Sequence, residues 1–370
     1  MAHPDTATGK LERTLTRAAR ARARVRDAMP EPQVLVIAPG FEFAFGDRAR
    51  RFHTASVGKT MTATLAFQLA ERGALDLDAP ITGLLPAEEW RGLFVVDGID
   101  RAREVTALHL LAHTSGVADY FEGPTRAPRS FVDDVISAPD RLWAPADLLG
   151  YTREHQRPVG APGARFAYSD TGYVLAARII EEAGGAPLHR QLHERIFAPV
   201  GMDQSCLLFH SWPGGGDAGG DASRPPAAAL DLAPLWLGRH EVSRTRALSC
   251  DWGGGGVVST VDDLVRFSVA WHGGELVSPE SLARMTAASN RFRPGIRYGT
   301  GAMQLRYAGF SPFLRGMPHL TGHLGVTGAH LFGDDGSGIH LAFNFHATGE
   351  MVRSFRVHID LVRAALRDAR

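Results

Sequence analysis

Apolar residues recur at two different spacings along the chain, and these spacings predict its first secondary-structure elements. Residues 10–28 are rich in Ala, Leu and Arg and predict a helix. Residues 32–47 ("PQVLVIAPGFEFAFGD") predict two short strands on either side of a Pro-Gly turn. In residues 56–73, Met61, Leu65 and later apolar positions fall on one face of a helix that ends at a glycine.

The same patterns divide the rest of the chain into a helix-rich middle and a strand-rich end. Further helices are predicted over residues 105–112, 170–183, 187–197 and 260–272. Strands with turns are predicted over residues 295–305, 319–333 and 338–347, and a closing helix over 350–368. The stretch 211–229 is dense in Gly, Pro and Ala and predicts a loop. This order predicts an α/β domain built from residues 1–85 and 245–370, with a mainly helical domain of residues 86–244 inserted.

Composition places the chain among ordinary globular proteins. Lys+Arg and Asp+Glu each number 40, so the formal charge is zero and gives no reason to expect a nucleic-acid or anionic-membrane partner. Five arginines lie close together in the first predicted helix, and we interpret them as its solvated face; a binding arm is the alternative. They are Arg17, Arg20, Arg22, Arg24 and Arg26.

Cysteine usage and the absence of long apolar runs bear on the compartment. Two cysteines, Cys206 and Cys250, cannot form a disulfide framework and fit a reducing environment. The first 25 residues contain no apolar run of signal-peptide length, and no stretch approaches the roughly 20 apolar residues of a membrane span. We therefore expect a soluble cytoplasmic protein.

The stretch "HTASVGKTMTA", residues 53–63, allows two kinds of chemistry. Gly58-Lys59-Thr60 resembles the end of a phosphate-binding loop, but that loop needs a glycine where this chain has His53. The alternative is a nucleophilic Ser56 one helical turn before Lys59.

The second interpretation is physically consistent. Residues three apart share a helix face, and a serine near a helix N-terminus lies where the helix dipole favours developing negative charge. Lys59 could accept the Ser56 proton if burial lowers the lysine pKa enough to leave the amine neutral. By itself, Ser-x-x-Lys also fits an ordinary helix start, so other segments must support the assignment.

Four further segments occur in an order that carries a family resemblance. They are "LHLLAHTSGVADY" (108–120), "FAYSDTGYVLAARIIEEAGG" (166–185), "GGGGVVSTVDDLVRFSVAWHGGELVSPESLARM" (253–285) and "GHLGVTGAHLF" (322–332). Together with Ser56-x-x-Lys59, they resemble the class C β-lactamase-like branch of the serine β-lactamase and penicillin-binding-protein superfamily. This branch includes esterases, D-aminopeptidases and transacylases. The resemblance covers roughly residues 30–365.

The resemblance implies a fold and a set of roles. The fold would be α+β: an antiparallel sheet flanked by helices, plus an all-helical domain, with the site in the cleft between them. Ser56 would be acylated, Lys59 would be its base or proton relay, and Tyr168 would shuttle protons to the leaving group with a pKa lowered by an adjacent ammonium. The backbone N–H groups of Ser56 and Val326 would form the oxyanion hole, in which one donor is typically worth about 3–4 kcal/mol.

The third motif takes the form His323-Leu324-Gly325, which places His323 and Gly325 among the substrate-binding residues. In the family this histidine would lie on an edge strand and face the cleft. A histidine is only partly charged near neutrality, whereas a lysine at this place would be a fixed cation for a substrate carboxylate. Within the family, the histidine form resembles esterases, D-amino-acid peptidases and transacylases more than strong lactamases.

The second motif departs from the family at Asp170, which stands where the family has asparagine. An ionised carboxylate only accepts hydrogen bonds, and beside Lys59 it would favour a charged lysine. Tyr168 would then carry more of the base role. The substrate would either lack the side-chain amide of a β-lactam or offer a cationic group to Asp170.

Several other histidines and glycines carry weaker signals. His113 is expected to order the His-Thr-Ser-Gly turn. The pairs His109/His113 and His189/His193 have the spacing of a zinc helix but lack the expected carboxylate, and glycines 253–256 lack a dinucleotide-binding context. We therefore expect no metal and no cofactor.

The sequence thus predicts a serine acyl-transfer enzyme that acts on a small-molecule ester or amide through an acyl-Ser56 intermediate. Hydrolysis is the first expectation, and transfer to an amine acceptor in a biosynthetic pathway is the alternative. A β-lactamase or D-peptidase, and a sensor that is acylated without turnover, are further alternatives. The sequence does not predict an oligomeric state.

Overall fold

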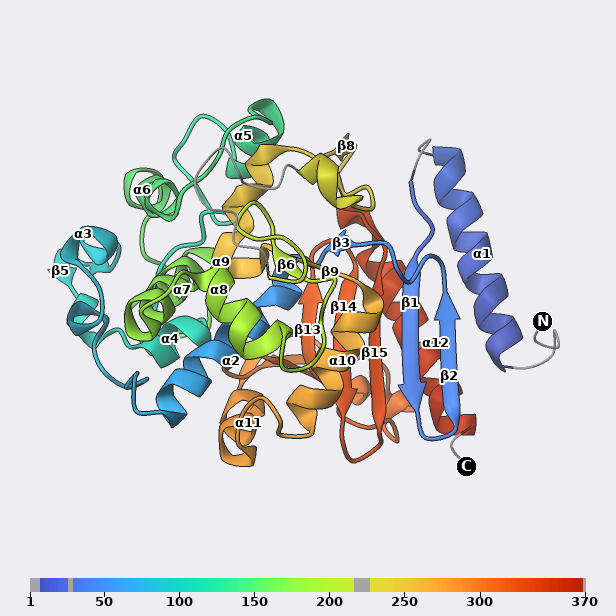
Figure 1. The fold of residues 1–370 in the computed structure, drawn as a ribbon. Coiled ribbons are helices and arrows are strands. Elements are labelled where there is room, and N and C mark those ends of the chain that lie inside the picture. Colours follow the sequence, from blue (N-terminus) through green and yellow to red (C-terminus); the bar gives the residue numbers. More distant parts are fainter. Residues whose placement is uncertain (1–6, 26–28, 216–226, 369–370) are drawn as a thin grey trace.

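One large antiparallel sheet joins the two ends of the chain (Figure 1). The computed structural model describes residues 7–25, 29–215 and 227–368. The strands follow the order β10-β11-β12-β13-β14-β15-β1-β2. Their bounds are β1 (Gln33–Ala38), β2 (Phe41–Phe45), β10 (Asn290–Arg293), β11 (Ile296–Tyr298), β12 (Met303–Leu305), β13 (Thr321–Gly325), β14 (Ala329–Asp334) and β15 (Ile339–Asn344). The pairing of β1 with β15, in the register Leu35↔Ala342, brings the chain ends together.

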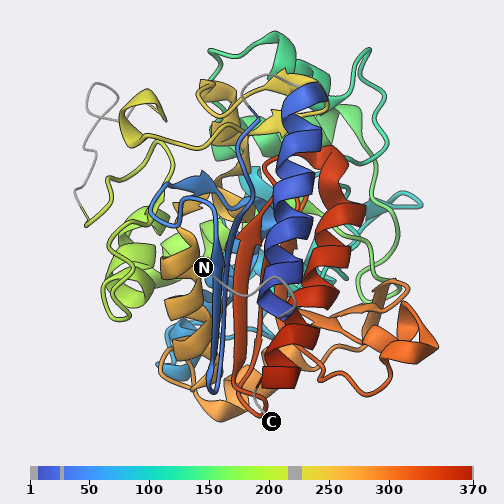
Figure 2. The ribbon, with the colours of Figure 1, turned by 90° about the vertical axis from the view of Figure 1, so that its right-hand side faces the viewer.

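Side-chain alternation along β1 explains why the sheet is covered on both faces. Val34 and Val36 pack in a cluster with α1 (Ala7–Val25) and α12 (Met351–Asp368), whereas Leu35 belongs to the larger cluster on the opposite face. Figure 2 shows α1 and α12 side by side over one face. Helix α10 (Val261–His272) packs against the other face.

The middle of the chain is mainly helical and gathers on one side of the sheet (Figure 1). The helices of the middle part are α2 (Gly58–Glu71), α3 (Ala87–Trp90), α4 (Ala107–Leu111), α5 (Phe131–Ser137), α6 (Pro145–His155), α7 (Asp170–Gly184) and α8 (Leu188–Leu192). Two further helices, α9 (Trp252–Gly255) and α11 (Pro279–Thr286), come later in the chain. Short strands form three small sheets: β3 (Phe52–His53), β9 (Val257–Ser259) and β6 (Cys206–Leu207); β4 (Val95–Val96) and β5 (Ile99–Asp100); and β7 (Trp236–Leu237) and β8 (His240–Glu241).

Helix α2 differs from the one-sided helix that its apolar spacing predicts. It is buried on every side from its first residue to Leu69. Its polar side chains are paired: the Thr60 hydroxyl donates to the Gly301 carbonyl at 3.0 Å, and the Thr62 hydroxyl donates to the Gly253 carbonyl at 2.9 Å. A central helix of this kind keeps polar residues only where each finds a partner.

The predicted fold class is confirmed, and most predicted elements appear within a few residues of their expected bounds. The sequence analysis missed the short helices α3, α5, α6, α9 and α11. Residues 26–28, with Arg26, and residues 216–226 of the predicted loop lie outside the described residues. The division into domains at residues 85 and 245 stays a prediction. None of the described helices combines the length and the apolar character needed to cross a membrane.

Candidate active site

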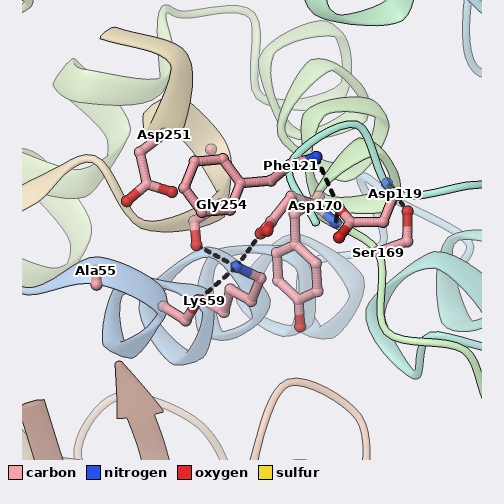
Figure 3. Close-up of polar contacts among 12 residues, drawn as sticks. Ala55, Lys59, Asp119, Phe121, Ser169, Asp170, Asp251 and Gly254 are labelled. Carbon is pink, nitrogen blue, oxygen red and sulfur yellow. Dashed lines mark hydrogen bonds and ion pairs between the residues drawn. The ribbon is translucent and has the colours of Figure 1, made fainter. Parts of the chain in front are cut away.

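Ser56 and Lys59 meet at the start of α2. Ser56 lies in a short 3₁₀ turn, Ala55–Val57, directly before the helix, and Lys59 is fully buried in the first helical turn. The Lys59 Nζ atom donates to Ser56 Oγ at 3.0 Å and to the Gly254 carbonyl at 2.5 Å, and it forms an ion pair with Asp170 (Figure 3). The amine is therefore held against the serine by groups from α7 and α9.

Tyr168 arrives from the segment before α7 and completes this cluster. Lys59 Nζ lies 5.1 Å from the Tyr168 ring centroid, and the phenol interacts with both Ser56 and Lys59. The His113 ring packs on the tyrosine with the two centroids 4.1 Å apart, and its Nδ1 accepts the Ser169 N–H at 3.1 Å. His113, itself buried, thus fixes the segment that carries Tyr168, in line with the structural role expected for it.

Lys59 is charged in this arrangement. Burial by itself lowers the pKa of Lys59, but the negative charge of Asp170 is the largest opposing effect, and the pKa is raised above the ordinary range. The condition that burial would leave a neutral lysine is therefore not met. The expectation that Asp170 favours the charged form of Lys59 agrees with the structure.

The expected lowering of the Tyr168 pKa is also not found. Burial raises the pKa of Tyr168, and this outweighs the opposing effect of the Lys59 ammonium and of the hydrogen bonds from Ser56 and Lys59. The nearby Asp170 carboxylate adds to the increase. The resting site thus contains an ammonium, a carboxylate and a neutral phenol.

His323 does not face the cavity as expected. Strand β13 lies between β12 and β14 rather than at the sheet edge, and the His323 side chain is fully buried. Its Nδ1 pairs with the Leu324 carbonyl at 2.7 Å, and its Nε2 with the Tyr298 hydroxyl at 3.1 Å. Burial lowers the pKa of His323 to about 3, so the ring is neutral and supplies no cation for a substrate carboxylate.

A cavity of about 360 Å³ opens beside Ser56. Ser56, Tyr168, Asp170, Gly325 and Val326 all line it, so five of the seven predicted site residues border one space. Ser56 and Val326, whose backbone N–H groups are the predicted oxyanion donors, are both among these lining residues. Further lining residues include Asp119, Phe121, Glu122, Asp251, Phe292, Arg293, Ile296, Met303, Leu324, Met351 and Phe355.

Asp119 and Asp251 are polar cavity residues that the sequence analysis missed. Asp119 accepts the N–H groups of Asp170, Phe121 and Glu122 at 3.0, 3.2 and 3.0 Å, which ties the loop after α4 to the start of α7 (Figure 3). Burial, together with the charge of Asp170, raises the pKa of Asp119. Burial likewise raises the pKa of Asp251, against the opposing effect of Lys59. Asp119 lies within one of the quoted motifs and Asp251 beside another, and this position in the sequence was the signal that could have identified them.

The glycine run after Asp251 permits close packing against the nucleophile. A Cβ atom on Gly255 would lie 2.4 Å from the Ala55 carbonyl oxygen, and one on Gly254 would lie 3.0 Å from Asp170 Oδ1. A side chain at Gly255 would displace the turn that carries Ser56, and one at Gly254 would crowd Asp170 and Lys59. The glycine run therefore allows its backbone to lie in close contact with the turn before Ser56.

The histidines with zinc-helix spacing have local roles. His109 lies in the N-terminal capping box of α4, where its Nδ1 accepts the Thr106 N–H at 3.2 Å. His113 holds Ser169, as described above. The His189 ring stacks on His210, with the ring centroids 6.1 Å apart.

Comparison with known proteins adds independent findings. The family profile described as Beta-lactamase matches residues 47–364. Penicillin-binding protein 4 of Amycolatopsis lactamdurans is 29% identical over 245 residues, which cover 64% of this chain and 55% of that protein. Monacolin J acid methylbutanoyltransferase of Aspergillus terreus is 33% identical over 173 residues, which cover 43% of this chain and 38% of that protein.

A solved structure agrees over nearly the whole chain. The crystal structure of a D-stereospecific amidohydrolase from a Streptomyces species superposes with a TM-score of 0.73 at 25% identity, covering 94% of this chain and 97% of that one. In contrast, the chain spans about half the length of the curated penicillin-binding proteins it matches, 55% and 52% of two of them.

Proposed function

The chain belongs to the β-lactamase family, and from this premise we propose that it is a serine acyl-transfer enzyme that hydrolyses a small ester or amide through an acyl-Ser56 intermediate. One observation carries the proposal: Ser56 and Lys59 of one motif meet Tyr168 of another, and Ser56 and Tyr168 line a cavity. A hydroxyl, an amine and a phenol in contact form a nucleophile with a proton relay.

In the proposed reaction, Ser56 Oγ attacks the substrate carbonyl carbon, and the serine proton passes into the Lys59–Tyr168 pair. Because both partners are protonated in the resting site, the reactive form carries one proton fewer than the resting form. Acylation should therefore accelerate as pH rises. The Ser56 and Val326 N–H groups would stabilise the oxyanion, and Tyr168 would return a proton to the departing alcohol or amine.

The cavity walls support a substrate class. Four carboxylates line the cavity, from Asp119, Glu122, Asp170 and Asp251, and Arg293 is the one cation among its described lining residues. Apolar residues of the sheet and of the start of α12 also line the cavity: Ile296, Met303, Leu324, Met351 and Phe355. We therefore propose a substrate that joins an apolar group to a positively charged one, because an ammonium would be favoured beside the carboxylates.

Transfer to an amine acceptor is the second candidate function. It is favoured by the similarity to Monacolin J acid methylbutanoyltransferase, which is an acyltransferase by its name. Hydrolysis and aminolysis need the same acylation machinery and differ in the group that resolves the ester. Adding candidate amines during turnover and looking for an amide product distinguishes the two.

The decisive experiment is intact-mass detection of the acyl group after exposure to a small library of aryl esters and amides. The library should contain matched pairs with and without an ammonium group. We expect a mass increase of one acyl group on the wild-type chain, none on Ser56→Ala, and faster acylation by the ammonium member of each pair. Tyr168→Phe should slow acylation by about 10²–10⁴-fold, as expected for loss of a general acid–base group.

The time course separates an enzyme from a sensor. Steady release of aryl alcohol after the first equivalent supports an enzyme, whereas a burst that stops after one equivalent supports an acylated sensor. Equal acylation of Ser56→Ala and wild type would overturn the proposal.

A further inference from the structure

The turn immediately before Ser56 adopts a backbone conformation that needs support. Ala55 has φ +50°, in the left-handed region that side chains with a Cβ atom rarely adopt. This residue is buried and directly precedes the nucleophile. Such a conformation persists only where surrounding groups hold it in place.

His53 supplies one of these contacts. The Ala55 N–H donates to His53 Nδ1 at 3.2 Å, across the turn. Thr54 anchors the same turn to β9, since its N–H and its hydroxyl both donate to the Val257 carbonyl at 2.9 Å. Gly255 leaves room for the Ala55 carbonyl, as described above.

The acceptor role of Nδ1 fixes the histidine tautomer. When Nδ1 accepts, the neutral ring carries its proton on Nε2. The His53 Nε2 atom lies 3.6 Å from Asp251 Oδ2, the carboxylate that borders the cavity and precedes the glycine run. The ring is 4% exposed, and burial lowers the pKa of His53 to about 4, so it remains neutral. Asp251 faces His53 and also experiences the charges of Lys59 and Asp170.

We propose that His53 is a positioning residue that holds the Ala55 turn through its Nδ1 atom and thereby orients the Ser56 hydroxyl toward the substrate carbonyl. His53 acts through the backbone and touches no reacting atom. The inference rests on the proposed function, because it assigns His53 a part in the acylation of Ser56.

The two ring nitrogens can be tested separately. Asn places an acceptor near the position of Nδ1 and can accept the N–H two residues on, so His53→Asn preserves the bond to Ala55. His53→Gln places its amide near the position of Nε2, so it keeps a polar group beside Asp251 but loses the hydrogen bond from the Ala55 N–H. The readouts are the single-turnover acylation rate with an activated aryl acetate and the rate of Ser56 labelling by a fluorophosphonate probe.

We expect His53→Asn to remain within about threefold of wild type in both rates. His53→Gln should acylate about 10²-fold more slowly at an unchanged KM, the effect expected of a nucleophile displaced by about 1 Å. Adding Ala55→Gly to His53→Gln should restore part of the rate, because glycine adopts positive φ without support. Thermal midpoints of all variants show whether they fold.

The pattern of outcomes separates this inference from the proposed function. A wild-type chain that neither acylates nor labels overturns both. A reactive wild type with equal rates for the Asn and Gln variants overturns the role of His53 alone. If both variants lose the folded state and Ala55→Gly restores neither folding nor rate, the proposed role of His53 is also overturned. His53 would then be required for folding rather than for the orientation of Ser56.

Discussion

At the scale of single residues, Asp170 decides the charge state of the site. The resemblance to the family places an asparagine at this position, and the carboxylate found here forms an ion pair with Lys59. Burial lowers the Lys59 pKa and the Asp170 charge raises it, with the charge prevailing. The same carboxylate raises the pKa of Tyr168. The Asp170 carboxylate therefore favours the protonated form of both proposed proton carriers, Lys59 most strongly.

Replacing Asp170 by Asn should move the pH dependence of acylation. Without the carboxylate, the Lys59 pKa falls, so the deprotonated site forms at lower pH. We expect the alkaline rise in the single-turnover rate to shift downward by about 1–3 pH units, the usual effect of one opposite charge in contact. Rate–pH profiles of Asp170→Asn and wild type measure this shift.

Asp140→Asn, which removes an exposed carboxylate, serves as the matched control and should leave the profile in place. An unshifted profile in Asp170→Asn would show that Asp170 does not set the charge state of the site.

At the scale of elements, the site depends on how closely the 251–255 segment approaches the start of α2. Lys59 is bonded to the Gly254 carbonyl, and the Ala55 carbonyl packs where Gly255 has no side chain. Neither contact follows from helix or strand periodicity. Both require that two segments far apart in sequence touch through their backbones.

Gly255→Ala should disturb this contact, because its Cβ would lie 2.4 Å from the Ala55 oxygen. We expect a lower thermal midpoint and an acylation rate reduced by about 10²-fold, since the turn that carries Ser56 must shift. Differential scanning calorimetry and single-turnover kinetics report the two effects.

Gly150→Ala tests the opposite case in helix α6, where a Cβ atom would meet nothing within 4 Å. We expect an increase in stability of about 0.5–1 kcal/mol with unchanged activity, from the helix propensity of alanine. If Gly255→Ala behaved like Gly150→Ala, the close contact would be unimportant for the site.

At the scale of the whole molecule, buried neutral histidines link the C-terminal helix to the sheet. His358 of α12 lies 3.2 Å from His330 of β14, Nδ1 to Nδ1, and its Nε2 pairs with the Tyr307 hydroxyl at 2.6 Å. His330 Nε2 also pairs with the Ser354 hydroxyl of α12 at 2.9 Å. Burial lowers the pKa of His358 to about 3, well below the value of about 6.5 for an unfolded histidine.

These buried histidines make the free energy of unfolding depend on pH. Between about pH 6.5 and pH 3 the unfolded state binds the His358 proton and the folded state does not, so stability is complete above the unfolded pKa and falls as pH decreases. The single group should cost about 2 kcal/mol between pH 7.5 and pH 5. In His358→Gln, which cannot titrate, this part of the pH dependence should disappear even though the variant is less stable at pH 7.5.

Urea unfolding of wild type and His358→Gln at pH 7.5, 6 and 5 gives the free energy of unfolding of each protein as a function of pH, and the two pH dependences are compared. Parallel pH profiles for the variant and the wild type would mean that His358 does not account for the acid sensitivity.

The sequence by itself determined the features that depend on neighbours along the chain and on motif order. Ser56 and Lys59 are three residues apart at a helix start, so their contact follows from helix geometry. The order of the motifs indicated the α+β fold and the assignment of Tyr168, Asp170 and the Val326 segment to one cavity.

Only the tertiary structure decided how the grouped residues behave. The Lys59 pKa depends on burial and on Asp170 from another helix, and the burial of His323 depends on β13 lying inside the sheet. Asp119, Asp251 and the His53 contact likewise come from segments packed against one another. Desolvation and charge act through space, so a pKa or an exposed face is a property of the folded packing that spacing along the chain cannot supply.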